Sequence, residues 1–233
     1  MNGSSGSLVT EAPARDPATE APLSEAPGWL AVARAAKGFM PDDEGLALFR
    51  AGVEAGRSGL GPLLEIGTYC GKSAAYLGAA ARDSGTVLFS VDHHRGSLEL
   101  QPGWPHHDPE VVDPATGLTD TLPWARRTLV DAGLEGDVVL VVGESSTVAR
   151  SWQAPLSLLF IDGGHGEQVA WDDFAGWSPQ VAPGGTLAIH DVFADPSDGG
   201  QVPYDIYCAA LSSGRFGEAG TLGSLRFLRR LVG

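Results

Sequence analysis

Two short segments of the chain end in acids that could hold a metal ion. Asp162 closes the apolar run Leu156–Asp162, and Asp191 closes the run Thr186–Asp191. If these runs are neighbouring strands of one sheet, their backbones lie about 4.8 Å apart. Two carboxylates at that spacing can share a divalent cation, which relieves their repulsion. Oxygen ligands completed by water favour Mg²⁺, with Mn²⁺ as an alternative. A plainer interpretation is that both acids only cap loops.

His165 follows Asp162 by three residues, in the segment Phe160-Ile161-Asp162-Gly163-Gly164-His165. An imidazole titrates near neutral pH, so beside such an ion it could take a proton from a substrate hydroxyl. A lone histidine in a loop is often incidental, but the neighbouring acid pair makes His165 the candidate general base.

A glycine-containing corner between residues 63 and 73 is the candidate cofactor site, because Gly67 and Gly71 would let the backbone approach a ligand closely. A P-loop is excluded, since the spacing from Gly67 to Gly71 is one residue too short for it. A dinucleotide fingerprint is excluded as well, since Tyr69 occupies the position of its middle glycine. The remaining pattern, E-I-G-x-x-x-G, resembles motif I of class I S-adenosylmethionine-dependent methyltransferases, although a plain turn stays open.

Two further strand ends carry groups suited to a nucleoside. Asp92 closes the predicted strand Thr86–Asp92, where a carboxylate can accept two hydrogen bonds from a ribose diol. Glu144 and Ser145 follow the predicted strand Asp137–Gly143 and could meet an adenine edge, with a plain turn equally possible. An acid such as Asp92 serves NAD and S-adenosylmethionine alike, so it indicates the fold more than the reaction.

These residues need a scaffold of alternating strands and helices. The predicted strands are apolar and mostly lack alternation, as expected for strands covered on both faces. We therefore predict a single Rossmann-like, doubly wound α/β domain with a mostly parallel sheet and an antiparallel C-terminal strand pair. The predicted strands are Leu63–Gly67, Thr86–Asp92, Asp137–Gly143, Leu156–Asp162, Thr186–Asp191, Arg215–Ala219 and Leu225–Leu231; the predicted helices are one beginning at Asp42, then Lys72–Arg82, Pro123–Ala132, Ser146–Ser151, Glu167–Trp177 and Tyr204–Leu211.

Two segments lie outside this repeat. Residues 1–27 contain almost no large apolar side chain and are predicted to be a disordered tail before the domain at 28–233. Residues 93–121 form an insertion after the second strand, with Trp104 and the pair His106-His107. A loop of that length inside a domain is usually functional or disordered, and its position predicts a substrate lid.

Pro183–Gly185 is predicted to be a turn before the fifth strand.

Composition limits the partners. The 233-residue chain carries 15 basic and 29 acidic residues, a net charge of −14. This balance argues against a nucleic acid or an anionic membrane as the main partner. Two cysteines are too few for a disulfide framework, and no segment reads as a secretory signal or membrane anchor. We expect a cytoplasmic protein with a small-molecule substrate.

The combination I-D-G-G-H followed by W-D-D-F-x-x-W-S-P-x-V-A-P-G-G-T-L-A-I-H-D-V resembles the second half of cation-dependent class I O-methyltransferases. The resemblance runs from about Gly38 to Asp191. It is nearest to enzymes that act on sugars, either the macrolide-sugar type or the mycobacterial methylmannose polysaccharide type. It implies S-adenosylmethionine as methyl donor, Mg²⁺ or Mn²⁺ assistance, and methylation of a sugar or glycoside hydroxyl by in-line attack.

The resemblance also implies roles for individual residues. His165 matches the proposed base. Asp162 and Asp191 match metal ligands, and His190, which stands where some relatives have the first of two adjacent acids, is the expected third protein ligand. The full set of expected cofactor-binding residues is Glu65, Gly67, Thr68, Tyr69, Gly71, Ser73, Asp92, His93, Glu144, Ser145 and Asp162.

Three alternatives stay open at this stage. Within methyltransferases, a catechol-type phenol is the chief rival to a sugar as acceptor. The generic fold also allows a nicotinamide-dependent oxidoreductase, although G-x-G-x-x-G is absent. A cofactor-binding scaffold without activity is the third. A homodimer stays open as the oligomeric state.

Overall fold

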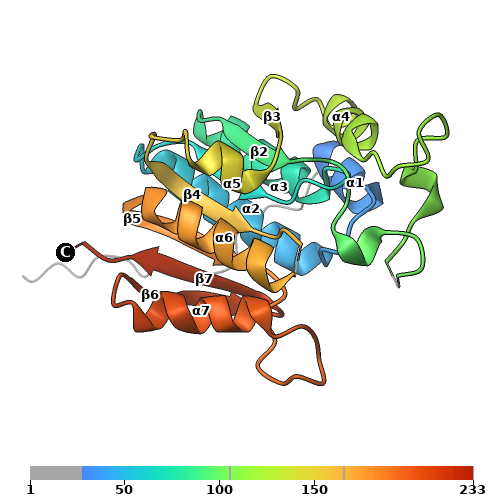
Figure 1. Ribbon diagram of the computed structural model, residues 1–233. Coiled ribbons are helices and arrows are strands. Elements are labelled where there is room, and N and C mark those ends of the chain that lie inside the picture. Colours follow the sequence, from blue (N-terminus) through green and yellow to red (C-terminus); the bar gives the residue numbers. More distant parts are fainter. Residues whose placement is uncertain (1–27, 105, 165, 233) are drawn as a thin grey trace, which may run out of the picture.

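A seven-stranded sheet forms the centre of the protein (Figure 1). The computed structural model describes residues 28–104, 106–164 and 166–232; the predicted tail, residues 1–27, lies outside them. The strand order is β3-β2-β1-β4-β5-β7-β6. β1 to β5 run parallel to one another, and β7 is antiparallel to both β5 and β6. The strands are β1 (Leu63–Ile66), β2 (Leu88–Asp92), β3 (Val138–Val142), β4 (Leu156–Ile161), β5 (Val181–Ile189), β6 (Phe216–Leu222) and β7 (Leu225–Arg230).

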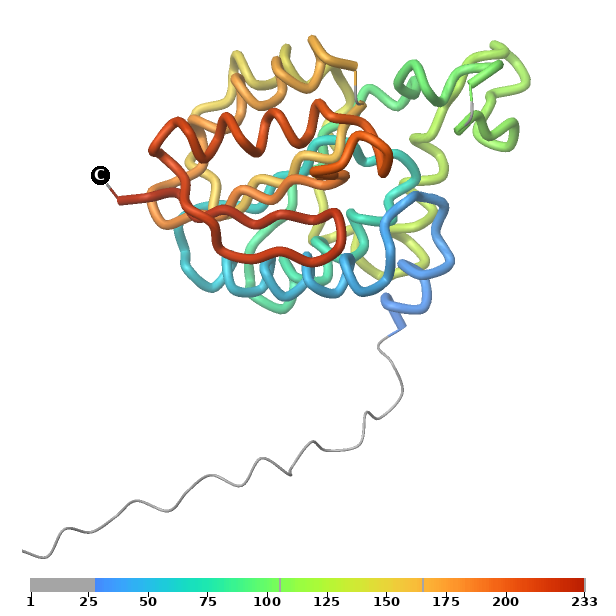
Figure 2. Tube along the Cα trace, turned by 90° about the horizontal axis from the view of Figure 1, so that it is seen from below, coloured from blue at the N-terminus to red at the C-terminus, as the bar shows by residue number. Residues whose placement is uncertain are grey.

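Helices cover both faces of this sheet, with α2 on one side and α6 and α7 on the other (Figure 2). The α-helices are α1 (Gly28–Ala35), α2 (Asp42–Arg57), α3 (Lys72–Ser84), α4 (Leu122–Asp131), α5 (Ser145–Ala149), α6 (Glu167–Trp177) and α7 (Val202–Ser212). Three short 3-10 helices accompany them, at Leu98–Leu100, Pro109–Val111 and Ser178–Gln180. The predicted doubly wound α/β fold with an antiparallel C-terminal pair is confirmed.

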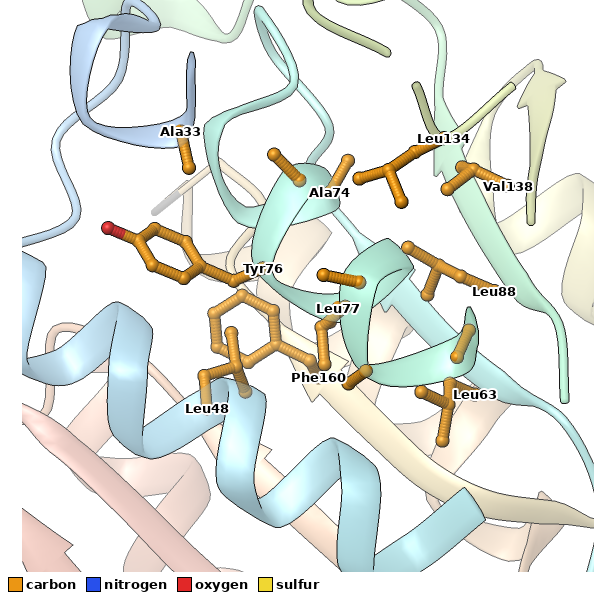
Figure 3. Close-up of a cluster of buried hydrophobic side chains, with 14 of the residues drawn as sticks. Ala33, Leu48, Leu63, Ala74, Tyr76, Leu77, Leu88, Leu134, Val138 and Phe160 are labelled. Carbon is orange, nitrogen blue, oxygen red and sulfur yellow. The ribbon is translucent and has the colours of Figure 1, made fainter. Parts of the chain in front are cut away.

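Alternating side chains of the central strands feed two separate cores. On β4, Leu158 and Phe160 belong to the core beneath α2 and α3, whereas Leu159 and Ile161 belong to the core beneath α6 and α7. Figure 3 shows the first core, where Phe160 lies among Leu48 of α2 and Tyr76 and Leu77 of α3. Because both faces are buried, the strands are apolar throughout, which explains the absence of alternation in the sequence.

The structure corrects one prediction of local structure. Pro183–Gly185, predicted to be a turn before the fifth strand, lies inside β5, which begins at Val181. Val181 pairs with Leu156, and the register then shifts before Thr186 pairs with Leu158. Gly184, at a φ of 81°, sits within this irregularity. The prolyl and glycyl residues therefore form a bulge that lengthens the strand.

α1 was not predicted, although ordered structure was expected from about Trp29. The indole of Trp29 in α1 stacks on the ring of Phe49 in α2, with ring centroids 5.0 Å apart. It also makes an edge-to-face contact with Tyr76 of α3, at a centroid distance of 5.8 Å. These contacts fasten the start of the domain over the first core. Among the described residues, no helix combines the length and apolar character that a membrane span requires.

Candidate functional site

A cavity of about 830 Å³ opens at the carboxyl edge of the parallel strands. Its size suits small-molecule binding, and its position is where ligands bind in open α/β sheets. The residues that follow β1 to β5 supply much of its wall. The predicted cofactor-binding residues that line it are Gly67, Thr68, Tyr69, Ser73, Asp92, His93, Glu144, Ser145 and Asp162.

Asp92 joins two corners of the site. Its Oδ2 accepts a hydrogen bond from the backbone N–H of Tyr69 at 2.8 Å, and its Oδ1 accepts one from the N–H of His94 at 2.7 Å. Both partners have a positive φ, 46° for Tyr69 and 59° for His94, which is uncommon outside glycine. The carboxylate is thus fixed in place on the cavity wall, and its remaining lone pairs can accept from a diol.

Gly67 has a different reason to be glycine from the one the sequence suggested. A Cβ on this residue would lie 2.1 Å from the carbonyl oxygen of Asp162, so a side chain here would collide with the neighbouring corner. Gly71 faces Ala125 and Thr128 of α4 and does not line the cavity. Both glycines, at φ of 96° and 88°, serve close packing between parts of the protein, and of the two only Gly67 lies on the cavity wall.

Glu65, predicted to bind cofactor, lies beneath the cavity wall instead. It is fully buried in β1, and its Oε1 accepts a hydrogen bond from Ser90 at 2.5 Å. The Ser90 hydroxyl also shares a 2.5 Å hydrogen bond with Thr68, which does line the cavity. Burial raises the pKa of Glu65 to about 8, against the opposing effect of hydrogen bonds from Ser90 and Ser73. A neutral Glu65 can therefore support Thr68 through Ser90.

Beyond β3, the cavity wall contains an acid that sequence reasoning missed. Asp173 of α6 is 2% exposed and lines the cavity near Glu144 and Ser145. Burial raises its pKa to about 6. The hydroxyl of Ser145 accepts a 2.7 Å hydrogen bond from the indole of Trp177. Asp173 and Trp177 are four residues apart and therefore lie on the same face of α6. Because Trp177 contacts Ser145, this helical spacing is the signal that could have predicted Asp173 near the site.

Asp162, His190 and Asp191 come together at the ends of β4 and β5, as predicted. One ligand atom of each lies within 4.8 Å of the others. The Nδ1 atom of His190 lies 3.0 Å from Oδ1 of Asp162 and 3.5 Å from Oδ2 of Asp191. Asp191 has a φ of 55°, a strained backbone of the kind that clusters at functional sites. Two aspartates and one imidazole form a donor set that fits a divalent cation.

Glu44 completes this cluster from the far side, and sequence reasoning missed it. Its Oε2 lies 2.6 Å from Nε2 of His190, while its Oε1 accepts a 2.6 Å hydrogen bond from the backbone N–H of Ser224. Burial alone would lower the pKa of His190, but Asp162, Asp191 and Glu44 outweigh it and raise this pKa to about 12. In the sequence Glu44 was only one of three acids in a helix first turn, so nothing marked it out.

His165, the predicted general base, lies outside the described residues. The predicted insertion is described except for residue 105. Its ends meet where Nδ1 of His94 lies 2.8 Å from the hydroxyl of Thr121, and the body extends from one end of the sheet (Figures 1 and 2). The insertion contacts the segment after α1, because Lys37 Nζ lies 2.6 Å from both Asp108 and Glu110.

Comparison with known proteins places this geometry in a family. A family model described as a methyltransferase domain matches residues 64–192. A protein from Corynebacterium glutamicum has a similar structure, at a TM-score of 0.64 and 16% identity over 91% of this chain and 93% of that one. The O-methyltransferase TomG from Streptomyces achromogenes, involved in tomaymycin synthesis and solved with S-adenosylmethionine, follows at 0.60 and 16% identity, covering 90% and 92%. The O-methyltransferase NovP matches at 0.59 and 18% identity, covering 80% and 79%.

The neutral state of Glu65 predicts a pH dependence of stability. Its pKa is raised from 4.5 to about 8 in the folded protein, so the stability that it contributes is present below the lower value and is lost as pH rises through the upper one. Between about pH 6 and about pH 9, the free energy of unfolding of the wild type should fall by on the order of 1–3 kcal/mol relative to Glu65→Gln. Urea unfolding at both pH values measures this, and parallel curves for the two proteins would contradict a neutral Glu65.

Proposed function

The chain belongs to the methyltransferase domain family, and from that premise we propose that it transfers a methyl group from S-adenosylmethionine to a hydroxyl of a sugar or glycoside, assisted by Mg²⁺ or Mn²⁺. The observation that carries the proposal is the arrangement of one cavity, which has Asp92, an acid suited to a ribose diol, at one corner and the Asp162–Asp191 pair at another. Donor and acceptor would thus meet between a nucleoside site and a cation site.

The donor half of the cavity suits the groups of S-adenosylmethionine. Asp92 is held by two backbone amides and can accept from both ribose hydroxyls. Glu144, Ser145 and Asp173 lie on the same wall and could meet the adenine edge. The many carboxylates of the wall would attract the positively charged sulfonium group. TomG, which has the same fold, was solved with this donor bound, and this supports the assignment.

Hydroxyl methylation is supported by the second half of the cavity, whose wall includes Asp162 and Asp191, with His190 buried beside them. Asp162, His190 and Asp191 offer one nitrogen and two carboxylate ligands at distances that fit a divalent cation. A cation held there would supply positive charge that lowers the pKa of an acceptor hydroxyl. His165 would take the hydroxyl proton as the new C–O bond forms and the donor's C–S bond breaks. The names of TomG and NovP, both O-methyltransferases, agree with this reaction.

A phenolic acceptor is the second candidate, because aromatic rings gather at the cavity mouth. Phe39 is 60% exposed, and its ring lies 5.2 Å from that of His106 and 5.8 Å from that of Tyr69. All three residues line the cavity. Such rings would stack on an aryl group as readily as on the apolar part of a glycoside. A panel of sugar and catechol acceptors, with methyl transfer followed by mass spectrometry, decides between them.

The donor assignment predicts that Asp92→Ala lowers affinity for S-adenosylmethionine by about 100-fold, because each lost hydrogen bond to a charged group contributes about 1.5–3 kcal/mol. Titration calorimetry measures the affinity, and Asp205→Ala, which removes an exposed acid on α7, is the matched control. Tight binding of NADH together with no binding of S-adenosylmethionine would overturn the donor assignment.

The metal-assisted mechanism predicts that substitutions of the metal ligand Asp191 and of the general base His165 impair different properties of the protein. Asp191→Asn should remove metal dependence and most activity while leaving donor affinity nearly intact, because the donor makes its main contacts elsewhere. His165→Ala should spare donor and metal binding yet lower turnover about 10²–10⁴-fold, the usual range for a general base. Single-turnover assays with calorimetry separate these effects. Full activity of the wild type in excess chelator would exclude metal assistance.

We propose that the insertion, residues 93–121, is a lid, fastened by Lys37 to the segment that carries Phe39. Lys37→Met removes its ion pairs with Asp108 and Glu110, which are partly exposed and thus contribute at most about 1 kcal/mol. Amide hydrogen exchange across the insertion should therefore become about 2–5-fold faster in the free protein. Exposed Arg127→Met is the control. If exchange is equally slow with and without S-adenosylmethionine, the segment is not a lid.

A further inference from the structure

We propose that the cation site is a mixed nitrogen–oxygen site that selects a first-row transition dication such as Mn²⁺ over Mg²⁺, with Nδ1 of His190 as ligand and Glu44 as the residue that positions it. The inference rests on the proposed function, which requires that a cation binds at this site. It goes beyond that function in naming the class of metal and the residue that sets it.

Two of the three distances between the ligand atoms are close to those of adjacent positions in a coordination shell. In an octahedral shell with bonds of about 2.1 Å, adjacent ligand atoms lie about 3.0 Å apart. The Nδ1 atom of His190 lies 3.0 Å from the carboxylate of Asp162 and 3.5 Å from that of Asp191. Small movements of the aspartates would bring all three atoms to bonding distance of a single ion, and water would complete the shell.

The imidazole is held in one orientation from several sides. His190 is 3% exposed, its backbone N–H donates to the carbonyl of Ile161 at 3.1 Å, and its ring meets the edge of Phe160 at 6.3 Å. Because Oε2 of Glu44 lies 2.6 Å from Nε2, the Nε2–H group donates to this carboxylate. The Nδ1–H group of the charged ring donates to Asp162 at 3.0 Å, and a cation would bind Nδ1 in place of this proton. A carboxylate that orients a histidine in this way is the usual partner of a metal-ligating imidazole.

Glu44 is itself held rigidly, which makes it suited to this role. It is 4% exposed, and Ser224 in the turn between β6 and β7 donates to it from its backbone N–H at 2.6 Å and from its hydroxyl at 3.2 Å. A Cβ on Gly223 would lie 2.0 Å from the Glu44 carboxylate, so the turn closes tightly over it. The helix α2 and the C-terminal hairpin therefore fix the ring of His190 together.

The nitrogen ligand decides the preference among metals. Mg²⁺ binds oxygen donors and keeps several waters, whereas imidazole favours transition dications, whose affinity rises from Mn²⁺ to Co²⁺ and Ni²⁺. Two carboxylates alone would suit Mg²⁺, as the sequence predicted. The imidazole between them shifts the site toward the transition metals.

The test uses the full chain, freed of metal with chelator, and measures binding of Mn²⁺, Co²⁺ and Mg²⁺ by calorimetry and by electron paramagnetic resonance of Mn²⁺. We expect affinities in the order Co²⁺, Mn²⁺, Mg²⁺, with Mn²⁺ at least about tenfold tighter than Mg²⁺. Pulsed resonance should detect a ¹⁴N nucleus bound to Mn²⁺. In His190→Asp the nitrogen signal should vanish and the ratio of Mn²⁺ to Mg²⁺ affinity should fall. Equal or tighter Mg²⁺ binding, or wild-type Mn²⁺ without nitrogen coupling, overturns the proposal.

Glu44→Gln tests the positioning role and should weaken Mn²⁺ binding about 10–100-fold, the usual loss when such a partner is changed. Asp195→Asn, which removes an exposed acid outside the cavity, is the control. Circular dichroism confirms that each variant is folded. If folded Glu44→Gln keeps the wild-type Mn²⁺ affinity and nitrogen coupling, Glu44 only packs against His190, and its proposed positioning role is overturned.

Failure of this inference and failure of the proposed function give different results. Methyl transfer to a hydroxyl by a protein whose bound Mn²⁺ shows no nitrogen coupling would overturn the metal site and leave the donor assignment standing. Nitrogen-coupled Mn²⁺ binding without methyl transfer to any acceptor in the panel would keep the metal site and overturn the hydroxyl methylation.

Discussion

The buried contact between Glu44 and His190 ties the candidate site to the rest of the fold. It brings together the start of α2, the end of β5 and the turn between β6 and β7, which are separated by up to 180 residues in the sequence. Removing one partner of such a buried pair typically costs about 3–5 kcal/mol, because the other charge is left uncompensated, although a hydrophobic pair can be equally stable. Stability alone therefore does not explain the pair, whereas the proposed orientation of the imidazole would.

A second constraint acts along the carboxyl edge of the sheet, where the backbone is strained. Among the described residues, the three non-glycine residues with positive φ are Tyr69, His94 and Asp191, which lie in the corners after β1, β2 and β5. Asp92 accepts hydrogen bonds from the first two, so the same carboxylate that faces the cavity also stabilises both corners. Backbone strain of this kind persists only where the surrounding structure stabilises it, and here the hydrogen bonds to Asp92 stabilise it at Tyr69 and His94.

The sequence was sufficient for residues whose place follows from strand order. Once β1, β2, β4 and β5 are parallel neighbours, the acids at their ends meet at one edge, so Asp92, Asp162 and Asp191 could be predicted. Glu44 could not, because its partner is 146 residues away and a helix first turn often carries acids for its own stability. The bulge at Pro183–Gly185 could not be predicted from the sequence either, because it depends on how Val181 pairs with Leu156. Gly67 was predicted as a place where a ligand approaches the backbone, whereas the structure places the backbone of Asp162 there, which leaves no room for a side chain.

The charge of the cavity links the two proposed ligands. Its wall carries the carboxylates Asp92, Glu99, Glu144, Asp162, Asp172, Asp173, Asp191 and Asp198 against the ammonium groups of Lys37 and Lys72. A sulfonium donor and a divalent cation would each offset part of this negative charge. Methyl transfer turns the cationic donor into a neutral thioether, so the acidic wall would attract the substrate form more strongly than the product form. The same carboxylates would repel phosphorylated or carboxylated acceptors, which favours a neutral hydroxyl compound as the molecule that enters beside Asp191.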